Sequence, residues 1–281
     1  MKIVDHQSPA LRLVHIAPGG SPFALGLREM WAYRELLYFL TWRDVKIRYK
    51  QTAIGILWAL LQPIVTTIIF TLLFSTWARF ETGAVPYPIF ALSALVIWLF
   101  NHGAITIASN SFVSQTNLVT KVYFPRLIVP LAASLAGVFD LIFSIAVLVA
   151  LMAYYRVSLT VNIALAPVFI ILAFIQTAAF GTMLSALNVR FRDVKFALPF
   201  VLQVWMIASP IFYPANVIPE KWRLVFALNP LTGIIEGFRS SLFGLPFDWP
   251  LIGVSISSIL VISLISLYIF KRMEDDFADI I

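Results

Sequence analysis

The stretch that decides the fold runs from Thr41 to Val65 and reads TWRDVKIRYKQTAIGILWALLQPIV. Its first ten residues include five charged side chains, and its last fifteen include none. The tetrapeptide Arg-Asp-Val-Lys of the charged half, at 43–46, returns at 192–195, again where a basic run meets an apolar run. Such a boundary is typical of a chain that enters a membrane, because basic residues gather at the cytoplasmic ends of spans.

Composition supports a membrane protein. Hydrophobic residues make up 60% of the 281 residues, charged residues make up 12%, and the mean hydropathy is +0.91. Soluble domains carry about 25% charged residues, so this chain is predicted to be an integral membrane protein. The absence of cysteine excludes disulfides and thiolate metal sites. The three histidines have no metal-ligand spacing, and we expect no metal and no cofactor bound by this chain.

Apolar segments of about 20 residues, the length that crosses a bilayer, occur in six places. The predicted fold class is therefore an all-α membrane protein with six transmembrane helices. The clear spans are 54–77, 127–153, 161–187 and 250–270, and the weaker ones are 87–107 and 197–213.

The leading residues, 1–28, hold prolines and glycines but no apolar run, so we expect a flexible cytoplasmic tail and no cleavable signal peptide. One transmembrane domain, 29–281, is expected to follow.

Lysine and arginine are unequally divided between alternate loops. Six spans place both ends of the domain on one side, which carries eleven of these residues against five on the other. Cytoplasmic loops carry the excess, so both termini, and both Arg-Asp-Val-Lys copies, are predicted to be cytoplasmic. The orientation rule alone is sufficient to explain basic residues at both copies.

Residues 29–50 are too charged to cross the bilayer but are strongly periodic. At about 100° per residue, an aliphatic face and an aromatic stripe separate. This pattern predicts an amphipathic helix lying along the cytoplasmic interface. The first face holds Tyr33, Leu36, Leu37, Leu40 and Ile47, and the stripe holds Trp31, Tyr38, Trp42 and Tyr49.

The segment before the last span has two apolar pieces, 221–228 and 231–245, each too short to cross. Asn229 and Pro230 mark a turn between them. We expect a short re-entrant helical pair at about 221–245, entering the outer leaflet. Glu236 and Arg239, three residues apart on one helix face, are expected to pair.

Asp140 lies in the middle of the predicted span 127–153. A carboxylate inside a membrane is costly, and a proton or cation relay is one explanation. The alternative is a neutral or hydrogen-bonded side chain that contacts Ser, Thr or Asn of a neighbouring helix.

No catalytic motif is present. The sequence has no G-x-x-x-x-G-K-[ST] phosphate loop, no G-x-S-x-G elbow and no H-E-x-x-H pair. We therefore expect a protein that is not an enzyme, with any ATP chemistry supplied by another chain.

Several segments in this order resemble the ABC-2-type permeases of bacterial polysaccharide export, especially the O-antigen (Wzm-type) branch, with capsule and teichoic acid permeases as near relatives. The resemblance covers about 29–281. Its segments are YKQTAIGILWALLQPI at 49–64, NLVTKVYFPRLIVPL at 117–131, LNVRFRDVKFALPFVLQVWMIASPIFYP at 187–214, NPLTGIIEGFRSSLFG at 229–244 and FADII at 277–281.

The resemblance implies a homodimer in the bacterial inner membrane, with two copies of a separate ATPase subunit that binds ATP and Mg. It implies that the ATPase contacts a helix at about 111–123, the interface helix, and the loop between spans four and five. The residues expected at that contact are Asn117, Lys121, Arg190, Arg192 and Asp193. We hypothesise that each Arg-Asp-Val-Lys copy sets a helix end there, with the Asp holding the turn.

For a lipid-linked polysaccharide, the resemblance implies a passage at the dimer axis, walled by spans one and five. Aromatic rings stack on the apolar faces of sugars, and the candidates inside the passage are Phe70, Phe74, Trp205, Phe212 and Tyr213. Tyr38 and Trp42 are expected near the entry. Arg43, Arg48 and Lys50 are expected to attract the lipid pyrophosphate. Membrane lipid is an expected partner, and nucleic acid is not.

Two other functional classes remain open on the sequence. One is an ABC-2 exporter of small hydrophobic molecules, which would share the architecture. The other is a proton-coupled secondary carrier built around Asp140, which would depend on the proton gradient and not on ATP.

Overall fold

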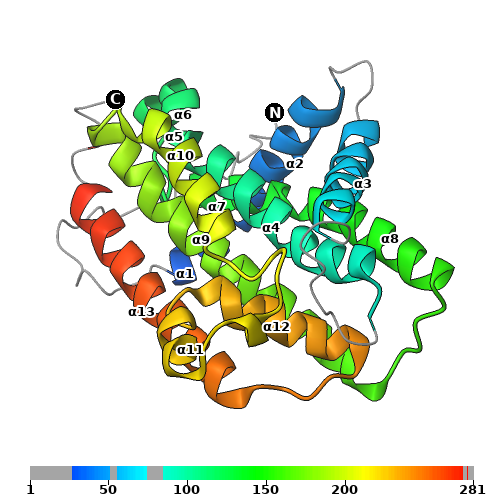
Figure 1. The fold of residues 1–281 in the computed structure, drawn as a ribbon. Helices are drawn as coiled ribbons and strands as arrows, with labels where there is room; N and C mark the ends of the chain where they lie inside the picture. Colours follow the sequence, from blue (N-terminus) through cyan, green and yellow to red (C-terminus); the bar gives the residue numbers. More distant parts are fainter. Residues whose placement is uncertain (1–26, 51–55, 75–84, 275–276, 278–281) are drawn as a thin grey trace, which may run out of the picture.

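The computed structural model describes residues 27–50, 56–74, 85–274 and 277, and these are helical with no strand among them. Figure 1 shows a bundle built around α4 (Tyr87–Ser109). α4 contacts α3 (Ile56–Leu73), α7 (Ile128–Ala136), α8 (Val138–Tyr154) and α9 (Ala166–Arg190). The hydrophobic core therefore forms around the helix that the sequence marks as one of the two weaker spans.

Four candidate spans are long and apolar enough to cross a membrane. They are Tyr87–Ser109, Ile128–Tyr154, Val161–Arg190 and Trp249–Glu274. The predictions at 87–107, 127–153, 161–187 and 250–270 are confirmed as apolar helical segments of spanning length. The segment Ile128–Tyr154 includes a change of helix at Gly137, and the segment Val161–Arg190 begins with the 3-10 helix η2 (Val161–Leu165).

The other two predicted spans are shorter than expected. α3 covers Ile56–Leu73, and the ends of the predicted span 54–77 lie outside the described residues. α10 (Val194–Ile207) ends well before residue 213, so the end of the predicted span 197–213 is wrong. The helix ends because the carbonyl groups of Ala208, Pro210 and Ile211 bind side chains of other segments. Six complete spans are therefore a prediction that the helix lengths do not establish.

The predicted interface helix is divided at Tyr33 into α1 (Leu27–Ala32) and α2 (Arg34–Lys50). On its aliphatic face, Leu40 is buried and Leu36 and Leu37 pack against the same cluster. Ile47, expected on the same face, does not pack against this cluster and is 58% exposed. α7, on which α2 packs, turns into α8 at Gly137.

The aromatic stripe holds for Trp31, Tyr38 and Trp42, which are exposed. Tyr49 is an exception, because its ring packs edge-on against Phe143 of α8 at 6.0 Å and its hydroxyl binds Asp140. The end of α2 is thus attached to the third span.

The segment predicted at 221–245 forms two short helices, α11 (Glu220–Phe226) and α12 (Pro230–Phe243). Asn229 caps α12 by accepting a hydrogen bond from the Leu231 amide at 3.2 Å. Gly244, in the left-handed region at φ 67°, ends it. The expected pair forms, with Glu236 and Arg239 2.9 Å apart. The entry of these helices into the outer leaflet stays a prediction.

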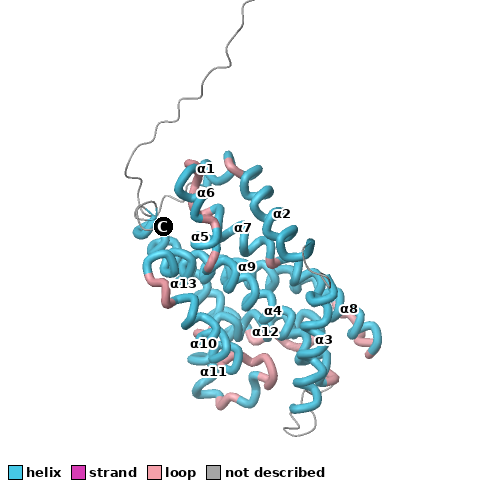
Figure 2. Tube along the Cα trace, turned by 90° about the horizontal axis from the view of Figure 1, so that it is seen from above, coloured by secondary structure: helices cyan, strands magenta, loops and turns pink. Residues whose placement is uncertain are grey.

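The short helices α5 (Ser111–Ser114) and α6 (Thr116–Lys121) follow α4, and α13 (Trp249–Glu274) ends the described chain apart from Phe277. Figures 1 and 2 place α5 and α6 at one end of the bundle and α11 at the opposite end. The residues expected to face the ATPase and the predicted outer helices therefore lie at opposite ends of the molecule.

Candidate functional site

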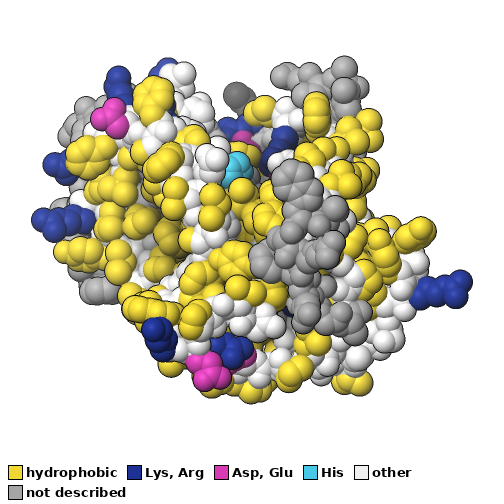
Figure 3. Space-filling view, in the orientation of Figure 1, with side chains coloured by type: hydrophobic (Ala, Val, Ile, Leu, Met, Phe, Trp, Pro, Cys, Tyr) yellow, Lys and Arg dark blue, Asp and Glu magenta, His cyan; other side chains and the backbone are white. Residues whose placement is uncertain are grey.

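An open cleft of about 510 Å³ lies between α2, α5 and α7, and Figure 3 shows charged side chains gathered in a hollow next to α2. α2 supplies its charged wall, α5 supplies hydroxyl and amide groups, and α7 supplies two alanines. The lining residues are Arg43, Asp44, Ile47, Arg48, Ile107, Ser111, Ser114, Gln115, Ala133 and Ala136. The small side chains of α7 leave the space open between the interface helix and the helix predicted to face the ATPase.

Arg48 lines this cleft and forms an ion pair with Asp140 of α8. Tyr49, the next residue of α2, donates its hydroxyl hydrogen to the other oxygen of the same carboxylate. Burial raises the pKa of the Tyr49 phenol well above its ordinary value, and the hydrogen bond to Asp140 adds to the shift. The phenol therefore stays protonated and remains a donor.

Asp140 thus has a partner that the sequence-based hypotheses did not include. We expected either a relay group or a hydrogen bond from Ser, Thr or Asn, and the observed partners are an arginine and a tyrosine of the interface helix. Both lie outside the predicted spans, so a search of spans alone could not find them. The one sequence signal at this place is that Asp140 lies three residues after Gly137, the glycine that divides Ile128–Tyr154 into α7 and α8.

A smaller pocket of about 260 Å³ is also lined by Arg48. α3 contributes Gln62 and Pro63, α4 contributes His102, and α8 contributes Asp140. Because Arg48 lines both this pocket and the 510 Å³ cleft, its guanidinium stands between them.

The other predicted entry residues lie nearby on α2. Arg43 binds Asp44, with Nη2 at 2.7 Å and Nε at 3.0 Å from the carboxylate. Trp42 packs against Phe139 at 6.1 Å between ring centroids. Tyr38 and Lys50 are exposed. The interface helix therefore carries exposed aromatic and basic groups side by side, although Arg43 and Arg48 already have carboxylate partners.

Three of the predicted path aromatics meet within one chain. Phe212 stacks on Phe70 of α3, with 3.8 Å between the ring centroids, and on Phe74, which follows α3, with 5.6 Å between the centroids. Phe212 is only 6% exposed. This cluster attaches the segment after α10 to α3.

Trp205 and Tyr213, the other predicted path residues, are not in that cluster. Trp205 packs against Phe180 at 4.7 Å and donates its indole hydrogen to Asn229 at 2.8 Å. Tyr213 donates its hydroxyl hydrogen to the Ile207 carbonyl at 3.2 Å. Both hold the outer end of α10 in place.

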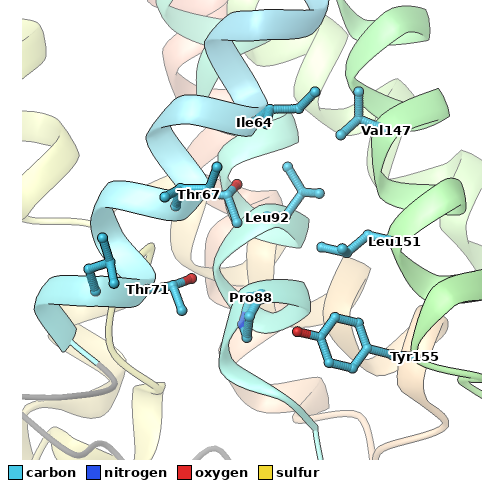
Figure 4. A pocket seen from close by; sticks show the side chains of 10 residues that line it. Ile64, Thr67, Thr71, Pro88, Leu92, Val147, Leu151 and Tyr155 are labelled. Carbon is cyan, nitrogen blue, oxygen red and sulfur yellow. The ribbon is translucent and has the colours of Figure 1, made fainter.

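A separate apolar cleft of about 330 Å³ opens between α3, α4 and α8, as Figure 4 shows. Two threonines of α3, Thr67 and Thr71, and the ring of Tyr155 line it together with aliphatic side chains. The hydroxyl groups of both threonines are buried, and no hydrogen bond is seen for either within the described residues. This cleft suits an apolar occupant such as a lipid chain.

The residues expected to contact the ATPase are all exposed. Asn117 and Lys121 are on α6, Arg190 is the last residue of α9, and Arg192 and Asp193 lie between α9 and α10. Sequence reasoning missed Asn188, which donates hydrogen bonds to the Ser109 carbonyl at 2.9 Å and to Asn110 at 3.2 Å. Its only sequence signal is an amide near the end of a long, mostly apolar segment. It fixes the turn from α4 into α5 against the end of α9.

The two Arg-Asp-Val-Lys copies differ in structure. The first lies within α2, which continues to Lys50, so the hypothesis that it sets a helix end is wrong. There Asp44 binds Arg43 instead. The second copy does precede a helix, because α10 begins at Val194, but the Asp193 side chain makes no capping bond. The repeated tetrapeptide therefore has no common structural role.

At the opposite end of the molecule, Arg239 of α12 is 1% exposed. It donates to the carbonyls of Pro210 at 2.8 Å and Ile211 at 2.9 Å, and of Phe90 at 3.2 Å. Its guanidinium also lies 3.5 Å from the centroid of the Phe90 ring. This side chain therefore provides donors for two carbonyl groups of the segment that follows α10 and for one carbonyl group of α4. Among the described residues, no group of three or more histidine or acidic side chains could hold a metal.

A family model described as "ABC-2 type transporter" matches residues 35–243. The O-antigen export system permease protein RfbA of Myxococcus xanthus is 27% identical over 257 residues, which are 90% of this chain and 98% of that protein. The RfbA protein of Klebsiella pneumoniae is 26% identical, over 88% of this chain and 95% of that protein. The polysialic acid transport protein KpsM of Escherichia coli is 21% identical, over 81% and 87% respectively.

Proposed function

The chain belongs to the ABC-2 type transporter family, and on that premise we propose that it is the membrane subunit that exports a lipid-linked polysaccharide across the bacterial inner membrane. One observation carries the proposal: the similarity to O-antigen export permeases extends over nearly the whole of both chains. It therefore includes the interface helix, the helices α5 and α6, and the outer helical pair, and not only the apolar spans.

ATP hydrolysis is assigned to a separate ATPase subunit, which would bind ATP and Mg. The exposed surface of α6 and of the 190–193 segment is proposed as its docking surface, with Asn117, Lys121, Arg190, Arg192 and Asp193 in contact. The two hydrogen bonds of Asn188 support this, because they hold the turn from α4 into α5, which leads to α6, against the end of α9. A movement of the ATPase would then reach the bundle through α5 and α9 together. This end of the molecule would face the cytoplasm, with both termini.

The lengths of α3 and α10 support a homodimer with a central path. At about 1.5 Å per residue, the 14 residues of α10 span roughly 21 Å, which is less than the roughly 30 Å of a hydrocarbon core. The irregular segment that follows is tolerated at membrane depth only if it is buried in protein or lines an aqueous path. Phe196, Phe200 and Val204 are exposed along α10, and Ile68 and Leu72 along α3. We assign these surfaces to the second copy and to the path between the copies.

The glycan would enter at the interface helix. Tyr38 and Trp42 offer exposed rings on which sugars can stack, and Arg43, Arg48 and Lys50 offer charge to the lipid pyrophosphate. Phe70, Phe74 and Phe212 would give the path an aromatic wall farther out, with Trp205 and Tyr213 behind it.

A second candidate, export of small hydrophobic molecules, is favoured by the 330 Å³ apolar cleft with its threonine hydroxyls. A polysaccharide exporter would need this cleft only for the lipid tail of its substrate. The two candidates therefore differ in whether glycan accumulates when the chain is lost.

The experiment is to delete the gene and measure the lipid-linked glycan inside the cell and the polysaccharide on its surface. Accumulation on the carrier lipid with loss from the surface, both reversed by the restored wild-type gene, would support the proposal. Normal surface glycan in a strain with no second permease would refute it and favour the hydrophobic-molecule candidate.

A further inference from the structure

Both arginines of the 510 Å³ cleft already have a carboxylate partner from this chain. Arg48 pairs with Asp140, and Arg43 pairs with Asp44. The two arginines and two carboxylates therefore cancel in charge. An anion that enters the cleft gains full attraction only if it replaces at least one of these carboxylates.

The two pairs differ in how much water screens them and in what they hold together. Arg43 and Asp44 are neighbours in sequence, and the Arg43 side chain is 38% exposed, so this pair is a weak surface contact. Arg48 and Asp140 connect α2 to α8, and the Asp140 side chain is only 18% exposed. Separating Arg48 from Asp140 would therefore remove the ion pair between the interface helix and α8 and leave the Tyr49 contacts as the remaining attachment.

An anion can reach Arg48 without first passing Asp140. Arg48 lines both the 510 Å³ cleft and the 260 Å³ pocket, whereas Asp140 lines only the 260 Å³ pocket of these two. A guanidinium that faces two cavities can bind a new partner from one side while it leaves the old partner on the other. Pyrophosphate suits such an exchange, because its oxygens accept paired hydrogen bonds from the guanidinium and carry more charge than one carboxylate.

Tyr49 lowers the cost of the exchange for Asp140. Its hydroxyl donates to Oδ1, whereas Arg48 binds Oδ2, so the carboxylate keeps one hydrogen bond after Arg48 leaves. A partly buried carboxylate with no remaining partner would bear the full desolvation penalty.

We propose that Asp140 is an internal competitor for the pyrophosphate of the substrate: it occupies Arg48 when the cleft is empty, and the arriving pyrophosphate displaces it and so removes the ion pair between α2 and α8, while Tyr49 keeps its hydrogen bond to Asp140. This inference rests on the proposed function, since it takes its ligand from there. It adds a regulatory step, because binding of the substrate head group itself loosens the interface helix.

The test is the affinity for inorganic pyrophosphate of the full-length protein in phosphatidylcholine nanodiscs at fixed ionic strength. The ATPase subunit is left out because its phosphate loop would bind the probe. The variant Asp140→Asn removes the competitor but keeps an acceptor for Tyr49, and it should lower the Kd about tenfold. The double variant Asp140→Asn with Arg48→Gln should lose this gain.

Tyr49→Phe should act in the opposite direction. Without the phenol, Asp140 depends more on Arg48, so displacement becomes harder and the Kd should rise about threefold. This variant keeps both charges, and it tests the proposal even if Asp140→Asn does not fold. If the gain in Asp140→Asn came only from the removal of a negative charge, Tyr49→Phe would leave the Kd for pyrophosphate unchanged.

Asp248→Asn is the matched control. It removes a carboxylate that is also paired with an arginine, Arg223 at 2.8 Å, on the α11 side of the molecule. It should leave the Kd unchanged. An unchanged Kd in Asp140→Asn, or a gain that persists in the double variant, would overturn the proposal. Normal surface glycan in the deletion strain would instead refute the proposed function, while the order of the pyrophosphate affinities would stand.

Discussion

Replacement of Arg239 by methionine should destabilise the protein more than any other single arginine substitution among the described residues. The change keeps most of the side-chain volume but removes every donor. Three backbone carbonyls, of Phe90, Pro210 and Ile211, lose a buried partner, and the Glu236 carboxylate loses an ion pair at 2.9 Å.

The expected cost follows from these contacts. One buried acceptor left without a donor costs about 1–3 kcal/mol, and loss of one member of a buried pair costs about 3–5 kcal/mol. Because Glu236 is partly exposed and can be hydrated, the loss of the ion pair adds little, and three acceptors at the lower part of their range give about 3–5 kcal/mol. For a chain of this size, 1 kcal/mol lowers the melting midpoint by about 2–4 °C, so the midpoint should fall by roughly 6–20 °C.

The assay is tryptophan fluorescence during heating in one detergent at one scan rate. Arg223→Met is the control, since Arg223 also pairs with a carboxylate but is 40% exposed. An exposed pair is worth about 0–1 kcal/mol, so the control should move the midpoint by no more than about 4 °C. Equal shifts in the two variants would refute the assignment of Arg239 as the group that satisfies the end of α10.

Two other substitutions test the packing and the coupling. Gly237→Ala places a Cβ 2.0 Å from the nearest ring atom of Phe169 and should cost about 1–3 kcal/mol through overpacking of α12 on α9; Gly253→Ala meets nothing within 4 Å and should leave the melting midpoint unchanged. Asn188→Leu removes both hydrogen bonds to the turn between α4 and α5, so it should cost about 1–3 kcal/mol of stability and lower surface glycan in complemented cells that hold equal amounts of the protein. Full export by this variant would contradict a role for Asn188 in positioning α5.

The apolar segments could be predicted from the sequence because hydropathy and length decide which helices can cross a bilayer. The pair Glu236 and Arg239 could also be predicted, because three residues on one helix fix their distance. The early end of α10 could not, since it depends on donors from α12 and on Asn229, which are distant in sequence. Local patterns do not contain such contacts.

The candidate site shows the same division. Exposed basic residues on α2 could be predicted from charge and period, and the aromatics Tyr38 and Trp42 are exposed as expected. The pairing of Arg48 with Asp140 could not be predicted, because the partners are far apart in sequence and belong to segments of different kinds. The stacking of Phe212 on Phe70 likewise depends on where α10 ends. Tertiary contacts, and not local propensity, decide what each functional residue touches.

Arg239 and Arg48 show how one residue type serves two purposes in this chain. Arg239 donates to three carbonyls and a carboxylate and is 1% exposed, so no ligand can reach it and none of its partners can leave without an unsatisfied group. Arg48 pairs with one carboxylate, which has a second donor in Tyr49, and its side chain is 34% exposed beside two cavities. The number of partners and the access to solvent make Arg239 a structural residue. The same two properties make Arg48 the arginine whose partner can be exchanged.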